Sequence, residues 1–214
     1  MVLPLSVDVG ANRRPWGNWL LIATTAVVFL ATAQHVLLHG ETDSVLVLDG
    51  PGPGLLGHVL LHADLLHLLG NMLFLWVFGN AVCARVGSLG YLVCYAVFAL
   101  AAAFAHLALS DRPAIGASGA INGVVGMFFV FHPKDYVTFG LVNLGRMREL
   151  PTWTLVGLWL GLDLFGLLSG SGGIAYAAHL GGFVAGALLA LLLLKAEWVD
   201  DPPGPTLLDL YWRR

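Results

Sequence analysis

Three short polar motifs interrupt an otherwise apolar chain, and their residue types are those of acyl-transfer chemistry. Ser118 lies in AIGASGAING, His179 in AYAAHLGGFVAG, and His67 and Asn71 in HADLLHLLGN. A serine hydroxyl becomes a nucleophile when a neutral imidazole within hydrogen-bond reach accepts its proton. His67 and Asn71 are four residues apart on one helical face, where both side chains can donate hydrogen bonds to a developing oxyanion.

Each motif taken alone also has a simpler interpretation. Small residues such as those around Ser118 are common where membrane helices pack, so the serine can be a packing residue. His67 and Asn71 can satisfy each other's hydrogen bonds, and Asp64 is placed to cap the helix that begins at Leu65. The choice depends on how the elements that carry these residues are arranged.

The composition places the chain in a lipid bilayer. Hydrophobic residues make up 58% of the 214 residues and charged residues 11%, with a mean hydropathy of +0.82, whereas soluble domains carry about a quarter charged residues. We therefore expect an all-α polytopic membrane protein. The net charge of −3 and the absence of a basic stripe indicate no nucleic-acid partner.

Six apolar runs are long enough to be candidate membrane helices. They lie near Trp16–Leu38, Leu65–Val82, Leu89–Leu109, Ala117–Phe131, Trp153–Leu168 and Tyr176–Leu194. The predicted organisation is a cytoplasmic segment over 1–15, a six-helix membrane domain over 16–195 and a cytoplasmic tail over 196–214. The segment 134–151 mixes apolar and basic residues and is expected to lie along the cytoplasmic interface.

The first run has an alternative as a cleaved signal peptide, because two arginines precede it and Ala31–Ala33 resembles a small-residue cleavage site. The run is long for a signal core, and further hydrophobic helices follow it. An uncleaved first span is the better prediction.

The basic residues predict the orientation. Nine of the ten lysines and arginines fall on one side of a six-span arrangement and only Arg112 on the other, which places both termini in the cytoplasm. The second, fourth and sixth spans then begin at the outer face. His67, Ser118 and His179 thus lie at one depth, and polar groups in a bilayer usually face the interior of the bundle or water. Their common level suggests a site.

Glycine spacing predicts which helices meet. His179, Gly182 and Gly186 follow an i, i+3, i+7 pattern on one face of the sixth span. The fourth span carries a matching face of small residues, so these two helices are expected to pack closely, with the glycines beside Ser118 also leaving its hydroxyl accessible. The expected close-packing glycines are Gly116, Gly119, Gly123, Gly182 and Gly186.

Together the motifs resemble the rhomboid family of intramembrane serine proteases. The likeness runs from HADLLHLLGNMLFLWVFGN through GASGAINGVVG to GGIAYAAHLGGFVAG. It implies a six-helix bundle with a short central fourth helix, with Ser118 as nucleophile and His179 as general base in a dyad that has no carboxylate member. His67, Asn71 and the Ser118 backbone N–H would form the oxyanion hole.

The resemblance also implies partners and a location. Its substrates would be transmembrane segments of other proteins, cut near their outer end, and it would use no metal and no cofactor. The protein would be a multi-pass protein of a bacterial plasma membrane, with its active site open to the outer side. The sequence contains no HExxH zinc motif, and His58 and His62 are expected to lie on the wet surface.

Three features depart from the family pattern. Residues 39–57 lack the Trp-Arg pair that rhomboids often carry in the first loop, and Asn122 occupies a position that is aromatic in some relatives. Asp163 is an acid within the apolar stretch WLGLDLFGLL, and we interpret it as a protonated or hydrogen-bonded structural residue. Two other functions stay open: a rhomboid-like protein that binds transmembrane segments without cutting them, and a small transporter.

Overall fold

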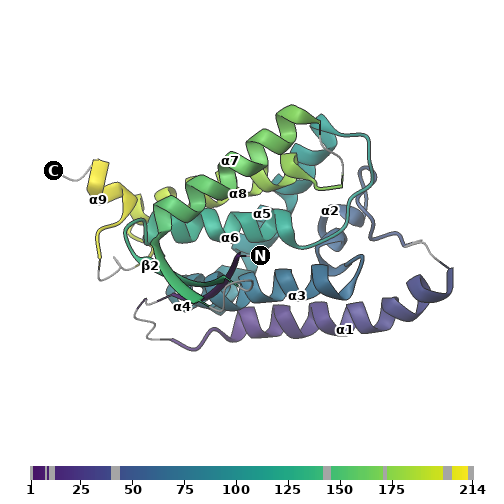
Figure 1. Cartoon of the computed structure of the whole chain (residues 1–214), viewed down its shortest axis with the longest axis horizontal. Helices are drawn as coiled ribbons and strands as arrows, with labels where there is room; N and C mark the ends of the chain where they lie inside the picture. The colour runs from purple at the N-terminus through teal and green to yellow at the C-terminus, as the bar shows by residue number, and fades with distance from the viewer. Residues whose placement is uncertain are drawn as a thin grey trace.

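The computed structural model describes residues 2–7, 9, 13–39, 44–141, 146–170, 173–199 and 204–211. Its helices are α1 (Trp16–His39), α2 (Gly54–Gly57), η1 (His58–Leu60), α3 (Leu65–Phe74), η2 (Leu75–Gly79), α4 (Asn80–Val86), α5 (Ser88–Leu109), α6 (Ser118–Phe131), α7 (Thr152–Ser169), α8 (Tyr176–Lys195) and α9 (Leu207–Tyr211). Its strands are β1 (Val2–Val7), β2 (Tyr136–Leu141) and β3 (Arg146–Pro151). In Figure 1, α1 and α7 lie on opposite sides of the bundle.

All six expected apolar runs are helical in the structure, with bounds close to those predicted. Among the described residues, four stretches are long and apolar enough to cross a membrane: Leu65–Val86, which joins α3, η2 and α4, and the helices α5, α7 and α8. Trp16–Thr32 and α6 are shorter apolar helices. At about 1.5 Å per residue, α6 covers about 21 Å of a hydrocarbon core that is about 30 Å thick. The count of six crossings therefore stays a prediction.

The helix α6 lies at the centre of the bundle. Eleven of its 14 residues are buried, as expected for a helix that is apolar on all sides. It packs on α8 with backbone contact: a Cβ on Gly182 would meet the Gly119 carbonyl oxygen, and one on Gly186 would meet that of Gly123. The predicted packing of these two helices is confirmed, and the close contact explains why glycine occupies both positions on α8.

A buried polar cluster joins three helices at the end opposite the start of α6. Asn18 of α1 is fully buried and its amide donates to the Leu75 carbonyl oxygen and to Asn80 Oδ1, each at 2.8 Å. The Tyr91 hydroxyl of α5 donates to Asn18 Oδ1 at 2.7 Å. Leu75 begins the π-helical turn η2. Because buried polar groups are costly when unpaired, this cluster fixes α1 and α5 against that turn.

The all-α prediction is wrong in one respect, since the chain also forms a three-stranded antiparallel sheet in the order β1-β2-β3. Val7 of β1 lies opposite Val137 of β2, and Val137 and Phe139 are part of the hydrophobic core. Thus the segment expected along the cytoplasmic interface folds into β2 and β3. Alternating apolar residues in YVTFGL are typical of a strand, but the partner β1 lies about 130 residues earlier, beyond the reach of local sequence patterns.

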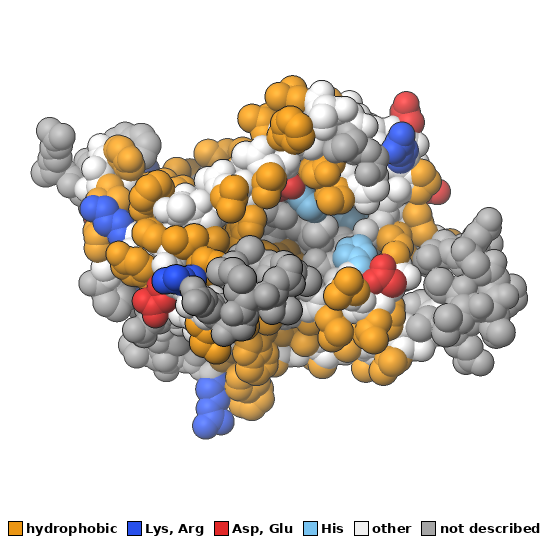
Figure 2. Space-filling model, viewed as in Figure 1, with side chains coloured by type: hydrophobic (Ala, Val, Ile, Leu, Met, Phe, Trp, Pro, Cys, Tyr) orange, Lys and Arg blue, Asp and Glu red, His pale blue; other side chains and the backbone are white. Residues whose placement is uncertain are grey.

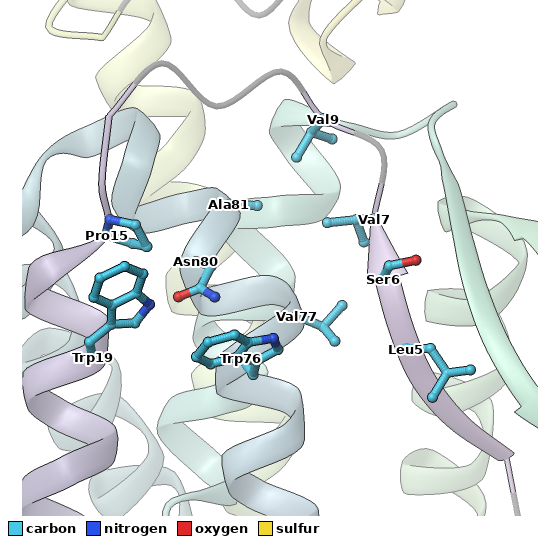
Figure 3. A pocket seen from close by; sticks show the side chains of 10 residues that line it. All are labelled: Leu5, Ser6, Val7, Val9, Pro15, Trp19, Trp76, Val77, Asn80 and Ala81. Carbon is cyan, nitrogen blue, oxygen red and sulfur yellow. The ribbon is translucent and has the colours of Figure 1, made fainter.

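A small cavity of about 310 Å³ lies where β1 faces α1 and the helices that follow α3 (Figure 3). The rings of Trp19 and Trp76 stack beside it, with centroids 6.4 Å apart and an interplanar angle of 13°. Its lining is apolar or neutral: Leu5, Ser6, Val7, Val9, Pro15, Trp19, Trp76, Val77, Asn80 and Ala81. Ser6 supplies a hydroxyl to this lining, but the lining has no histidine, aspartate or glutamate that could activate it.

The α6–α8 contact predicts a strong effect of one added methyl group. Gly186→Ala places a Cβ against the Gly123 carbonyl oxygen, so we expect the free energy of unfolding to fall by about 1–3 kcal/mol. Gly157→Ala on α7 is the matched control, because a Cβ there meets open space and alanine favours the helix by about 0.5–1 kcal/mol. Thermal unfolding in detergent measures both variants. Equal stability of the two would contradict the close-contact interpretation.

Candidate active site

The structure brings Ser118 and His179 into hydrogen-bond contact. Ser118 is the first residue of α6 and His179 lies in the first turn of α8. The two helices begin level with each other because the glycine contacts align them. His179 Nε2 lies 2.9 Å from Ser118 Oγ, a distance at which the imidazole nitrogen can accept the hydroxyl proton.

The other ring nitrogen of His179 contacts a carboxylate. Nδ1 lies 3.0 Å from Asp163 Oδ1, and both side chains are 14% exposed. The family resemblance implied a dyad with no carboxylate, and the sequence interpretation gave Asp163 a structural role. In the structure Asp163 is hydrogen-bonded, as one part of that interpretation expected, and its partner is the imidazole of His179. In the sequence, the signal for this contact was a single acid within an apolar helix. The sequence could not identify His179 as the partner of Asp163, because the contact depends on how α7 is rotated against α8.

The helix α3 positions His67 and Asn71. Asp64 caps this helix as predicted, since its carboxylate accepts a hydrogen bond from the His67 backbone N–H at 2.8 Å. Asn71 is buried, with 8% of its surface exposed. Its Nδ2 donates to His62 Nε2 at 2.8 Å. One amide hydrogen of Asn71 is thereby committed to His62, which leaves the second to point elsewhere.

Gly116, one of the glycines expected at close contacts, lies two residues before Ser118. Its φ is +120°, a backbone conformation that favours glycine. A Cβ at this position would lie 2.7 Å from His67 Cε1 and 3.9 Å from Asn71 Nδ2. The missing side chain is therefore what allows the loop before α6 to lie beside the His67 and Asn71 side chains.

His58 and His62 are buried rather than on the wet surface, each 3% exposed, so that expectation was wrong. His58 Nδ1 lies 2.8 Å from the Gly54 carbonyl oxygen. Burial lowers the pKa of His58. Burial, together with the nearby His67, lowers the pKa of His62 to about 4. His62 is thus neutral near pH 7, as an acceptor for the Asn71 amide must be.

Asn122, one turn after Ser118, now has a structural explanation. Its Nδ2 donates to the Ser118 carbonyl oxygen at 3.0 Å. Such a bond to the preceding turn leaves the side chain folded onto its own helix. Asn122 therefore satisfies its amide locally, at the first turn of α6, where an aromatic side chain would instead extend away from the helix.

Two cavities border these residues, and Figure 2 shows histidine side chains within a hollow on one face of the molecule. The larger, of about 660 Å³, is lined by residues that include Asp64, His67, Arg112 and Tyr176. The second, of about 440 Å³, lies between α3, α6, α7 and α8, and its lining includes Phe74, Asn122, Trp159, Asp163 and His179. The second cavity thus exposes the side chains of His179 and Asp163, and the first exposes that of His67.

Metal-binding residues do not gather in the part of the chain that the structure describes. There, no group of three or more histidine, cysteine, aspartate or glutamate side chains could hold a metal ion. Cys83 and Cys94 are buried free thiols.

The fold and the site define a helical membrane protein with a hydroxyl and an imidazole held together at the starts of two closely packed helices. Comparison with known protein families matches residues 53–196 to the rhomboid domain, which is well over half of the chain. The protein belongs to the rhomboid family, and with its apolar helices it is an integral membrane protein.

A curated relative aligns with most of the chain. The chain is 28% identical over 195 residues to rhomboid protease GluP of Bacillus subtilis (strain 168), an alignment that covers 86% of this chain and 36% of GluP. The chain thus spans about a third of the length of that relative.

The low pKa of His62 predicts acid sensitivity. The unfolded chain protonates this histidine near pH 6.5, whereas the folded protein keeps it neutral down to about pH 4. Falling pH between these values therefore favours the unfolded chain, by up to about 3 kcal/mol. We expect the Tm in detergent to fall between pH 7 and pH 4.5, and to fall less in His62→Gln. An unchanged pH dependence in this variant would contradict the assignment.

Proposed function

We propose that this protein is an intramembrane serine endopeptidase that cleaves transmembrane segments of other membrane proteins near their outer end. The observation that carries the proposal is the 2.9 Å contact between His179 Nε2 and Ser118 Oγ, at the starts of two helices that border the cavities. A neutral imidazole in contact with a serine hydroxyl is the arrangement that nucleophilic catalysis requires.

The reaction follows from this contact. His179 Nε2 accepts the Ser118 hydroxyl proton while Oγ attacks the carbonyl carbon of the substrate peptide bond. The imidazolium then protonates the leaving amine, and water activated by the same nitrogen hydrolyses the acyl-enzyme. No metal or cofactor takes part in these steps.

The oxyanion of the tetrahedral intermediate needs donors beside Ser118. The Ser118 backbone N–H has no acceptor within its own helix, because it belongs to the first turn of α6. His67 and Asn71 adjoin the Gly116 backbone, two residues before the nucleophile. We assign these three groups to the oxyanion hole, in which Asn71 would use the amide hydrogen that His62 does not accept.

The proposed function includes an orientation in the membrane and a class of substrate. We propose that both termini are cytoplasmic, that the protein resides in a bacterial plasma membrane and that the site opens to the outer side. A transmembrane segment would lie in the cavities with part of its helix unwound. A protein that only binds such segments is the alternative, but binding requires neither the Ser118 hydroxyl nor its contact with His179.

The nucleophile can be tested directly. The purified protein in detergent is expected to react with a serine-specific fluorophosphonate and to cut a model transmembrane substrate, whereas Ser118→Ala and His179→Ala lose both activities. Ser6→Ala is the matched control, because this exposed serine lies in β1 and outside the two cavities beside the site; it should keep both. A wild type that neither reacts nor cleaves would refute the protease function.

Asn71 should act mainly in the transition state. We expect Asn71→Ala to lower kcat by about 10²–10³-fold, as for loss of one oxyanion donor, with little change in KM. Cleavage kinetics on the model substrate separate the two constants. A rise in KM without a loss of kcat would assign Asn71 to substrate binding instead.

A further inference from the structure

We propose that Asp163 is a positioning residue for His179, so that the site operates as a serine–histidine–aspartate array and not as a pair. The inference deepens the proposed protease function and rests on it. It departs from the dyad that the family resemblance implies, and it is carried by the geometry around one imidazole ring.

The ring of His179 bridges two groups from different helices. Ser118 Oγ of α6 lies 2.9 Å from Nε2, and Asp163 Oδ1 of α7 lies 3.0 Å from Nδ1. A neutral imidazole carries its proton on only one nitrogen. A carboxylate accepts the Nδ1–H, which leaves the Nε2 lone pair free for the Ser118 proton. With the opposite tautomer, Nε2 would point a hydrogen at Ser118 and could not act as a base.

The Asp163 side chain is much less exposed than those of its neighbours on α7. Its neighbours Leu162, Leu164 and Phe165 are exposed by 57%, 49% and 69% on an apolar helix, whereas the Asp163 side chain is 14% exposed and turned toward His179. An acid inside a membrane segment is expensive and marks function. Here the carboxylate has a partner whose positive charge develops during the reaction.

The proton balance is simple. As Ser118 Oγ forms its bond to the substrate carbonyl carbon, its proton moves to Nε2, and Nδ1–H stays hydrogen-bonded to the Asp163 carboxylate. The ring becomes an imidazolium, and the Asp163 carboxylate at Nδ1 stabilises its positive charge. Asp163 is not itself protonated, and nothing is oxidised or reduced.

The helix α7 must be docked for this contact to exist. Gly166, three residues after Asp163, lies so close to Tyr176 of α8 that a Cβ there would meet the tyrosine ring. One turn before Asp163, the Trp159 ring packs on Phe74, with ring centroids 5.1 Å apart. These contacts set the rotation of α7, and therefore the direction of the Asp163 carboxylate.

The test compares Asp163→Asn and Asp163→Glu with a matched control. Asp135→Asn breaks another aspartate–histidine pair, in which Asp135 Oδ2 lies 2.6 Å from His132 Nδ1 at the far end of α6. We expect Asp163→Asn to lower kcat and the fluorophosphonate reaction rate by about 10²-fold or more, with KM nearly unchanged, and Asp163→Glu to recover part of the loss. Asp135→Asn should retain both rates, whatever its Tm.

A second measurement does not depend on activity. Nitrogen-15 NMR of histidine-labelled protein, with the His179 signals assigned by His179→Gln, should show Nδ1 protonated in the wild type and the Nε2-protonated tautomer gaining population in Asp163→Asn. Wild-type rates and an unchanged tautomer in Asp163→Asn would overturn this inference alone. Equal losses of rate in Asp163→Asn and Asp135→Asn would also overturn it, as a general effect on stability. A wild type that neither reacts nor cleaves would instead refute the proposed protease function.

Discussion

The backbone contact between α6 and α8 is the constraint on which the rest of the structure depends. Gly182 and Gly186 bring the α8 backbone against the carbonyl oxygens of Gly119 and Gly123, closer than any side chain would allow. At this separation the two helices cannot slide or rotate freely, so the starts of both helices are level. Ser118 and His179 meet because they occupy those starts. A membrane core lacks water that could fill a looser interface, and packing of small residues is how such helices associate.

Around this pair, three further polar side chains of the site are oriented by hydrogen-bond partners. His62 accepts from the Asn71 amide, Asp163 contacts His179 Nδ1, and Asn122 donates to the Ser118 carbonyl oxygen. In surroundings of low dielectric a hydrogen bond is stronger than in water, so these contacts favour a single geometry. The geometry of the site therefore depends on several hydrogen-bonded side chains, and not on Ser118 and His179 alone. Five elements position these side chains: the segment before α3, α3 itself, α6, α7 and α8.

The region shared with the rhomboid domain, residues 53–196, contains every residue of this site. The strand β1 and the helix α1 precede it. They contribute to the opposite end of the bundle, where Asn18 joins α1 to Tyr91 and the Leu75 carbonyl oxygen and β1 pairs with β2. The polar site and its two cavities thus lie at the end of the bundle where α6 and α8 start. The sheet and the hydrogen bonds of Asn18 lie at the opposite end.

Local sequence patterns were sufficient to predict the helices and part of the site. Long apolar runs place all six helical stretches, Asp64 marks the start of α3, and the i, i+3, i+7 glycine pattern after His179 predicts that α8 packs on α6. These features depend on residues close together in the chain. The sheet, the burial of His62 and the contact of Asp163 with His179 were decided by tertiary structure. Each one joins segments whose relative position or rotation is set by the packing of other helices, and no local pattern encodes that packing.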